Sequence, residues 1–270
     1  MIQNIEPHKF DNQFKKSIPC ADSIILSFRN NKILCSITDG NLEYPRFNSK
    51  FYNIKYLFSI DNCAYFLADA DEFDKFTFVD IQKLRACTPK YSSFAGFTGY
   101  HLYNWYSKNI FCSACGERLF DSQKERALLC KCGNIIYPRI DIAVIVGVIR
   151  SGRLLLTRYS PEHSTYRRLT LVAGYTEIGE IAEETVAREV FEEVGIKVKD
   201  IKYFASQPWG LSGGLLLGYF CYADDNAEII MDKAELCEAK WLLPEEIDFD
   251  DDDVSLTNNM IAYFKNNMGK

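Results

Sequence analysis

The residues Gly174-Tyr-Thr-Glu-Ile-Gly-Glu180 are followed, after seven further residues, by Arg188-Glu-Val-Phe-Glu-Glu-Val-Gly-Ile196. The second stretch has the pattern of a helix, in which successive side chains turn by about 100°. On such a helix Glu189 and Glu193 lie about 40° apart, and Glu192 lies about 60° from Glu189 on its other side. An apolar stripe runs beside them and consists of Val186, Val190 and Val194. The sequence therefore predicts a helix anchored by one face that presents three carboxylates on the other.

Three carboxylates within about one helical turn repel one another unless a cation neutralises them. Hard oxygen ligands of this kind suit Mg²⁺ or Mn²⁺, which commonly bridge the phosphates of a substrate. The pattern thus favours metal-dependent phosphoryl chemistry. An acidic, solvated helix face is the alternative interpretation of the Glu-Glu pair taken alone.

The complete spacing Gly-x5-Glu-x7-Arg-Glu-apolar-x-Glu-Glu-x-Gly-apolar resembles the signature of the Nudix hydrolases and departs from it nowhere. That family uses divalent metals and water to cleave the pyrophosphate linkage of a nucleoside diphosphate joined to another group. The resemblance implies that Glu189 and Glu193 are the principal Mg²⁺ or Mn²⁺ ligands, with Glu192 as a further ligand or a close neighbour. It implies other roles around the loop: an ion pair between Glu180 and Arg188, a tight turn at Gly174, and a metal-directed carbonyl at Ala173.

Ten residues after Ile196 stands Ser206-Gln-Pro-Trp209, which resembles an element that marks the NAD(H) pyrophosphatases. There Gln207 would hydrogen-bond an amide or base edge, and Trp209 would stack on a base. A core Trp at a strand end is the alternative. The chain departs from the family's usual Pro-Phe-Pro continuation, because Leu211 replaces the aromatic residue. The implied substrate-binding segment consists of Gln207, Pro208, Trp209, Gly210, Leu211, Ser212, Gly213 and Gly214.

Four cysteines form two close pairs, Cys112-x2-Cys115 and Cys130-x-Cys132. Two such pairs separated by a short loop suit a structural Zn²⁺ ion held by four thiolates. The NAD(H) pyrophosphatases carry a zinc ribbon at this position, although their second pair is normally Cys-x2-Cys and is one residue shorter here. Ordinary core thiols are the alternative.

Three more positions follow from local matches to the same family. Tyr137 aligns with a substrate-contacting tyrosine, for which a packing role is the alternative. Glu235 matches a carboxylate that completes metal binding, with Glu238 as its nearby competitor. Thr257 lies where the family has a small residue that lines the substrate.

The 270 residues are 47% hydrophobic and 25% charged, which is ordinary globular composition and suggests two domains with a small module between them. The net charge of -6 argues against non-specific binding of duplex nucleic acid. The polar N-terminus is unlike a signal peptide, and the longest apolar run, Ile142–Ile149, is too short to cross a membrane. We therefore expect a cytoplasmic protein with free or metal-bound thiols and no membrane partner.

The fold class expected is an α/β Nudix fold, a mixed sheet between helices, preceded by a zinc ribbon and an N-terminal α+β domain. The domain limits expected are 1–107, 108–138 and 139–270. Helices are expected over Ser92–Lys108, Ile181–Val194 and Leu256–Asn266. The strands expected before the cysteines are Ser23–Phe28, Lys32–Ile37, Tyr56–Ile60 and Ala64–Ala68. Those expected after them are Ile142–Ile149, Leu154–Tyr159, Leu169–Ala173, Tyr203–Ser206, Leu215–Tyr222 and Lys240–Leu243.

The expected activity is metal-dependent hydrolysis of NAD(H) to AMP and nicotinamide mononucleotide, by a homodimer as in the family. An NAD cap on an RNA 5′ end presents the same bond and is a second expected substrate. A broader ADP-ribose or dinucleotide pyrophosphatase, and a non-catalytic nucleotide sensor, stay open as alternatives. Local basic charge that could guide an RNA strand or bind substrate phosphates comes from Arg150, Arg153, Arg158, Arg167 and Arg168.

Overall fold

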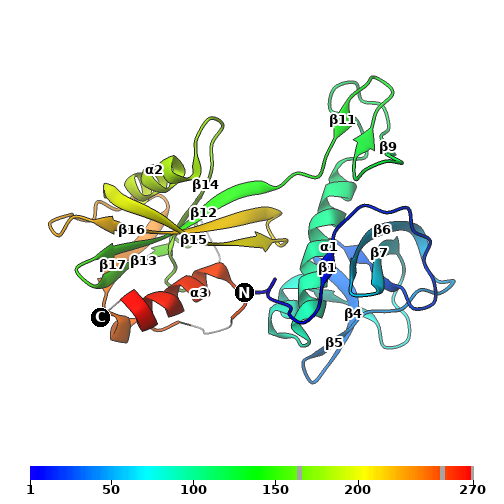
Figure 1. The fold of residues 1–270 in the computed structure, drawn as a ribbon, viewed down its shortest axis with the longest axis horizontal. Helices are drawn as coiled ribbons and strands as arrows, with labels where there is room; N and C mark the ends of the chain where they lie inside the picture. The colour runs from blue at the N-terminus through cyan, green and yellow to red at the C-terminus, as the bar shows by residue number, and fades with distance from the viewer. Residues whose placement is uncertain (163–165, 250–252, 269–270) are drawn as a thin grey trace. The chain divides into compact units, whose positions relative to one another are not determined.

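The computed structural model describes residues 1–162, 166–249 and 253–268 (Figure 1). The chain divides into two compact units. The first contains Met1 and residues 141–208 and 214–270, and the second contains residues 2–140 and 209–213. Among the described residues, no helix is long and apolar enough to cross a membrane.

The larger sheet of the first unit is mixed, as expected for an α/β fold. Its strands run in the order β15-β16-β12-β13-β17, and β14 pairs with β12. β12 and β16 are parallel, whereas β12–β14 and β13–β17 are antiparallel. The bounds of the strands are β12 Asp141–Arg150, β13 Arg153–Tyr159, β14 Val172–Tyr175, β15 Val198–Trp209, β16 Gly214–Ala223 and β17 Leu236–Leu242.

Two helices cover the two faces of this sheet because its strands alternate apolar side chains to both sides. On one face Val186, Val190 and Val194 of α2 (Ala182–Val194) pack on a core that includes Leu155. On the other face α3 (Leu256–Tyr263) packs on a core that includes Leu154. The mixed sheet between helices is therefore confirmed.

Two segments of this unit differ from the sequence expectation. The strand expected over Leu169–Ala173 begins only at Val172, because Thr170 makes an isolated bridge to Thr157 while β14 pairs with β12. The closing helix ends its regular α form at Tyr263 and continues as a π turn over Phe264–Met268. Part of the acidic stretch Asp248–Asp253 lies outside the described residues.

The second unit contains three small sheets and one long helix, and two of the sheets precede the helix. The strand orders are β1-β6-β7-β2 and β3-β4-β5, with β8 paired to β4. The expected strands before the cysteines include two hairpin pairs, β3–β4 and β6–β7, and Asn30 and Asp61 adopt positive φ at their turns. The bounds are β1 Phe10–Asp11, β2 Ile24–Leu26, β3 Phe28–Arg29, β4 Lys32–Thr38, β5 Asn41–Glu43, β6 Tyr52–Ile60, β7 Cys63–Asp69, β8 Thr77–Asp80 and α1 Lys90–Lys108.

The helix α1 contains Gly96 and Gly99, which weaken a helix in isolation. A Cβ on Gly96 would lie 2.3 Å from the Tyr44 hydroxyl, and one on Gly99 would lie 2.4 Å from a methyl of Leu26. The glycines therefore let β2 and the segment after β5 approach the helix closely. Phe94, Leu102 and Trp105 of this helix are buried. After α1 the chain forms the three short strands β9 Phe120–Asp121, β10 Leu128–Leu129 and β11 Ile135–Ile136.

Candidate active site

The helix α2 brings two acidic side chains into the interior of the first unit. Glu193 is only 2% exposed, and its Oε2 atom is buried with no hydrogen-bond partner among the described residues. Burial and, to a smaller extent, the nearby charges of Glu189 and Glu235 raise the pKa of Glu193 to about 8. A backbone hydrogen bond from Ala173 acts in the opposite direction. Such an unpartnered carboxylate oxygen is costly unless a ligand satisfies it.

Glu189 lies directly against the strand β14. A Cβ on Gly174 would be 1.8 Å from the carboxyl carbon of Glu189, so only glycine leaves room for this carboxylate. A tight turn was the expected reason for Gly174. The structure instead places Gly174 inside a strand, where the close approach of Glu189 explains the missing side chain. Burial also raises the pKa of Glu189.

Arg188 connects the acidic residues of the helix with the preceding loop. Its Nε and Nη2 donate to the two oxygens of Glu180 at 2.6 and 2.9 Å. Its Nη1 donates to Glu189 Oε1 at 2.7 Å and to Glu192 Oε2 at 2.9 Å, and Nη2 also reaches the Tyr175 carbonyl at 2.9 Å. The hydrogen bonds from Arg188 lower the pKa of Glu180 to about 2. The expected Glu180–Arg188 ion pair is present, and it also orients Glu189 and Glu192.

A fourth carboxylate completes the cluster from the start of β17. The negative charge of Glu235 acts on both Glu189 and Glu193 and raises the pKa of each, so Glu235 lies in their neighbourhood. Its competitor Glu238 instead pairs with Arg158 at 3.0 Å and with Lys240 at 2.8 Å. The structure thus brings Glu235, and not Glu238, to the carboxylates of α2.

Tyr159, at the end of β13, is a neighbour that the sequence analysis missed. Burial raises the pKa of its phenol, and the charges of Glu193, Glu235 and Glu189 add to the effect. The Tyr159 side chain packs on the same core as α2. Strand alternation from Leu155 would have placed it on this face, but its closeness to the carboxylates depends on the pairing of β13 with β17.

The donor set of this cluster fits a hard divalent cation. Glu189, Glu193 and Glu235 offer only carboxylate oxygens, which Mg²⁺ and Mn²⁺ prefer. The observation that supports such an ion is the buried Oε2 of Glu193, which has no hydrogen-bond partner among the described residues. The carbonyl of Ala173 stays a predicted ligand, since the interaction found there is a backbone hydrogen bond to Glu193.

The side chain of Gln207 is fully buried, and both ends of its amide are engaged. Its Nε2 donates to the Val254 carbonyl at 2.7 Å, and its Oε1 accepts from the Leu256 backbone N–H at 2.7 Å. The amide therefore holds the end of β15 to the start of α3, and it is not available for the expected substrate contact. Thr257, another expected substrate residue, lies half-buried on the first turn of α3.

The segment from Trp209 to Gly213 belongs to the second unit. The Trp209 ring lies 6.0 Å from the ring of Phe97, and the Arg85 guanidinium stands 5.4 Å from its centre. A Cβ on Gly210 would be 2.0 Å from the Phe97 carbonyl, so this residue also sits tightly on α1. Trp209 is half-buried between Phe97 and Arg85, and its stacking on a base stays a prediction.

The other predicted residues of the segment differ in exposure. Pro208 and Ser212 are exposed, Leu211 and Gly213 are half-buried, and Gly214 is buried at the start of β16. Tyr137 is 53% exposed in the second unit, and its hydroxyl donates to Glu125 at 3.2 Å.

The four predicted zinc ligands converge in the segment after α1. The Sγ atoms of Cys112, Cys115, Cys130 and Cys132 all lie within 4.8 Å of one another. The closest pairs are Cys115–Cys130 at 3.4 Å and Cys112–Cys132 at 3.8 Å. A tetrahedral zinc–thiolate site with bonds of about 2.3 Å has sulfur–sulfur edges of about 3.8 Å. The shortened Cys130-x-Cys132 pair is therefore compatible with Zn²⁺.

Comparison with protein-family models matches residues 138–264 to the NUDIX domain. This part of the chain is a NUDIX domain. A crystal structure of a NUDIX hydrolase from Nitrosomonas europaea superimposes with a TM-score of 0.51 at 22% identity, covering 58% of this chain and 92% of that one. At that identity the likeness shows the fold, which is the mixed sheet between helices described above.

Curated relatives extend the comparison beyond the NUDIX domain model. Two proteins named NAD-capped RNA hydrolase NudC are similar to this chain. The one from Mannheimia succiniciproducens is 36% identical over 155 residues, which is 55% of this chain and 57% of the relative. The one from Citrobacter koseri is 38% identical over 144 residues, which is 53% of this chain and 55% of the relative. The chain thus matches little more than half the length of these relatives.

Proposed function

We propose that this protein hydrolyses the pyrophosphate bond of NAD(H) to AMP and nicotinamide mononucleotide with Mg²⁺ or Mn²⁺. The buried, unpartnered Glu193 carboxylate among Glu189 and Glu235 carries the proposal. The NUDIX domain and the relatives named NAD-capped RNA hydrolase support it.

In this mechanism Glu189, Glu193 and Glu235 hold the divalent cation. When bound, the cation would neutralise negative charge on the two phosphates that the bridging oxygen joins. Arg188 keeps Glu189 and Glu192 turned to the same side of the helix through its two short hydrogen bonds. Gly174 leaves the space in which the Glu189 carboxylate is held. Water attacks one phosphorus and loses a proton to the solvent, the P–O bond to the bridging oxygen breaks, and that oxygen stays on the departing phosphate, so that each product carries a terminal phosphate.

NAD-capped RNA is part of the proposed substrate range because it contains the same bond and because the relatives carry that name. A broader ADP-ribose or dinucleotide pyrophosphatase is the second candidate. It is favoured by Leu211, which has no aromatic face for a base, and by Gln207, whose amide is engaged in the core.

The test is a panel of NADH, NAD⁺, NAD-capped RNA and ADP-ribose with Mg²⁺ or Mn²⁺. We expect Glu189→Gln to lower kcat by about 100-fold or more on every cleaved substrate, because the variant lacks one carboxylate of the proposed cation site. Each tenfold loss in kcat corresponds to about 1.4 kcal/mol of activation free energy. The exposed Glu228→Gln is the matched control and should keep wild-type activity. Unchanged turnover by Glu189→Gln would refute the site, and preferred cleavage of ADP-ribose would favour the second candidate.

The remaining parts of the proposal concern the whole chain. We propose three regions, an N-terminal domain at 1–107, a zinc ribbon at 108–138 and the hydrolase domain at 139–270. We also propose a homodimer in the cytoplasm that holds one structural Zn²⁺ per chain. The convergence of the four cysteines supports the zinc assignment.

A further inference from the structure

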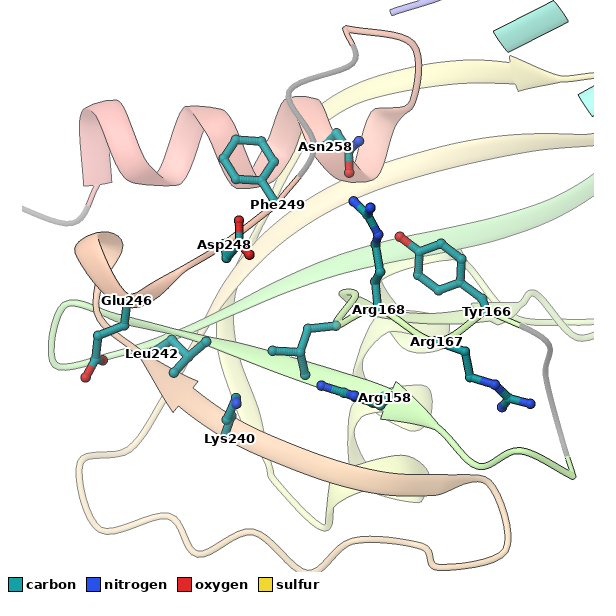
Figure 2. A pocket seen from close by; sticks show the side chains of 11 residues that line it. Arg158, Tyr166, Arg167, Arg168, Lys240, Leu242, Glu246, Asp248, Phe249 and Asn258 are labelled. Carbon is teal, nitrogen blue, oxygen red and sulfur yellow. The ribbon is translucent and has the colours of Figure 1, made fainter. Parts of the chain in front are cut away.

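A pocket in the second unit differs from the pocket in Figure 2 by the state of its neighbouring cation. In the pocket of Figure 2, which belongs to the first unit, Glu238 pairs with both Arg158 and Lys240. The pocket of the second unit has a volume of about 480 Å³, and its lining comes from the segment after β1, the strand β6, the end of α1 and the segment that begins in β9. All of these residues belong to the second unit. Arg126 lies beside this pocket, because the residues before and after it are both in the lining.

The guanidinium of Arg126 has no carboxylate partner among the described residues. Its Nη2 donates to the carbonyls of Asn12 and Leu57 and to Asn12 Oδ1. Its Nη1 is buried and has no hydrogen-bond partner in the described part of the chain. Burial lowers the pKa of Arg126, and the groups that oppose this effect are the phenols of Tyr106 and Tyr56 rather than an acid. A cation enclosed in this way is costly unless an anion accompanies it.

The phenol of Tyr56 is a second unsatisfied group at the same pocket. Tyr56 belongs to the lining and is 8% exposed, and its hydroxyl is buried without a hydrogen-bond partner among the described residues. An edge contact with Phe66, whose ring centre is 5.5 Å away, holds the Tyr56 ring. The phenol also interacts electrostatically with Arg126, so the two donors lie in one neighbourhood. Buried donors without a protein acceptor need an ordered water or the oxygen of a ligand.

The charges around the pocket favour an anion over a water molecule. Two lysines of the lining, Lys15 and Lys55, are each paired with an aspartate. The lining contains one further lysine and one glutamate, whose charges cancel. Arg126 therefore remains as an excess of one positive charge. A water molecule leaves this excess in place, whereas a ligand with a single negative charge cancels it.

Apolar and aromatic side chains also line the pocket. They include Phe14, Ile54 and the ring of Tyr106. Such walls bury a hydrocarbon or aromatic body, and a volume of 480 Å³ falls in the range of small-molecule sites. Guanidinium and phenol groups donate to carboxylate oxygens.

We propose that this pocket binds a small organic monocarboxylate with an apolar body, whose carboxylate accepts hydrogen bonds from Arg126 and Tyr56. Both donors are covered in this structure, and the exposed residues 16–18 are the part of the lining that moves to admit the ligand. Binding here does not require that the chain hydrolyse NAD(H).

The experiment measures binding to the full-length protein by isothermal titration calorimetry, in Tris-chloride buffer without added divalent cation. The probes are benzoate, its neutral isostere benzamide, and inorganic phosphate. We expect benzoate to bind at one site per chain and benzamide to bind at least about 10-fold more weakly, because benzamide brings no charge for Arg126. Absent benzoate binding, equal binding of benzamide, or tighter binding of phosphate than of benzoate would overturn the proposal.

Tyr56→Phe removes only the hydroxyl and should weaken benzoate binding about 10-fold. An unchanged or higher melting temperature verifies the fold, since the hydroxyl has no partner to lose among the described residues. The matched control is Tyr52→Phe, which removes the hydroxyl of a tyrosine that is 55% exposed at the start of the same strand. The control should bind benzoate like the wild type. Wild-type affinity of Tyr56→Phe for benzoate would contradict the proposed site.

Arg126→Met removes the excess charge and should abolish the preference for benzoate over benzamide. The exposed Lys124→Met removes a charge from the same segment, outside the lining, and should keep the preference. If Arg126→Met does not fold, the comparison of Tyr56→Phe with Tyr52→Phe decides, because neither variant alters a hydrogen bond of Arg126. A folded Arg126→Met that still prefers benzoate would overturn the proposal.

Discussion

At the scale of single residues, the carboxylates of α2 are in an electrostatically unfavourable environment that a bound cation would relieve. Glu193 is buried beside two other negative charges, and one of its oxygens has no partner among the described residues. Arg188 neutralises Glu189 and Glu192, whereas the charges that act on Glu193 are the negative ones of Glu189 and Glu235. The protein therefore stores an unfavourable electrostatic interaction at the place where the proposed metal binds.

The variant Glu193→Gln should show that Glu193 lowers the stability of the metal-free protein and that it binds the metal. A folded-state pKa of about 8 lies above the ordinary value, so the Glu193 carboxyl takes up a proton on folding at neutral pH, and the resulting loss of stability fades as the pH falls toward the ordinary value. The neutral, isosteric glutamine removes it. We expect the metal-free variant to melt at a higher temperature than the wild type and to lose the rise in Tm that Mn²⁺ produces.

Thermal melts with and without Mn²⁺ would measure both effects. Glu228→Gln, on an exposed position, should leave both melting temperatures as in the wild type. A variant that still gains the full Mn²⁺ shift would exclude Glu193 as a ligand.

At the scale of elements, Gln207 joins the end of β15 to the beginning of α3. Gln207→Ala would leave the buried Val254 carbonyl and Leu256 N–H without this partner. Each such unsatisfied group costs about 1–3 kcal/mol, so we expect the free energy of unfolding to fall by about 2–4 kcal/mol. Urea denaturation checks this, with the exposed Pro208→Ala as a control that should change little. A stability equal to that of the wild type would contradict this structural role and would favour the prediction that Gln207 binds substrate.

The cysteine cluster should behave as a metal-dependent element. Its strands β9, β10 and β11 are two residues each, too short to hold the segment by hydrogen bonds alone. We expect elemental analysis to find one zinc per chain and Cys132→Ser to release it and lower the melting temperature. Cys237→Ser, an exposed cysteine outside the cluster, should keep the zinc. A fully folded wild-type protein without zinc would refute a structural ion.

At the scale of the whole molecule, the chain interleaves its two units. Residues 209–213 belong to the second unit, although the strands before and after them belong to the first. Trp209 anchors this short segment by its contacts with Phe97 and Arg85. Since the anchor continues directly from β15, the two units should unfold together.

Trp209→Ala tests this coupling. Loss of a large aromatic contact typically costs about 3–5 kcal/mol, so we expect a lower melting temperature for the whole protein in one calorimetric transition. Leu211→Ala, a smaller and half-buried neighbour, is the control and should cost less. Two separate transitions in the wild type would show that the units unfold independently. A selective loss of NADH over ADP-ribose cleavage at unchanged stability would instead support a stacking role for Trp209.

The sequence alone determined the features that depend on local spacing. The carboxylates of α2 and the Glu180–Arg188 pair follow from residues within one short segment. The four cysteines are equally local, and they converge as expected. Such features are predictable because neighbouring residues and the helical repeat set their geometry.

Only the tertiary structure decided the features that depend on distant partners. The pairing of β13 with β17 brings Glu235 to the cluster and turns Glu238 toward Arg158 and Lys240. Where β15 meets the start of α3, hydrogen bonds to the backbone occupy the Gln207 amide. The contact of Gly174 with Glu189 explains a glycine that was expected at a turn. These outcomes depend on register and close packing between segments far apart in the chain, which side-chain patterns within a segment do not specify.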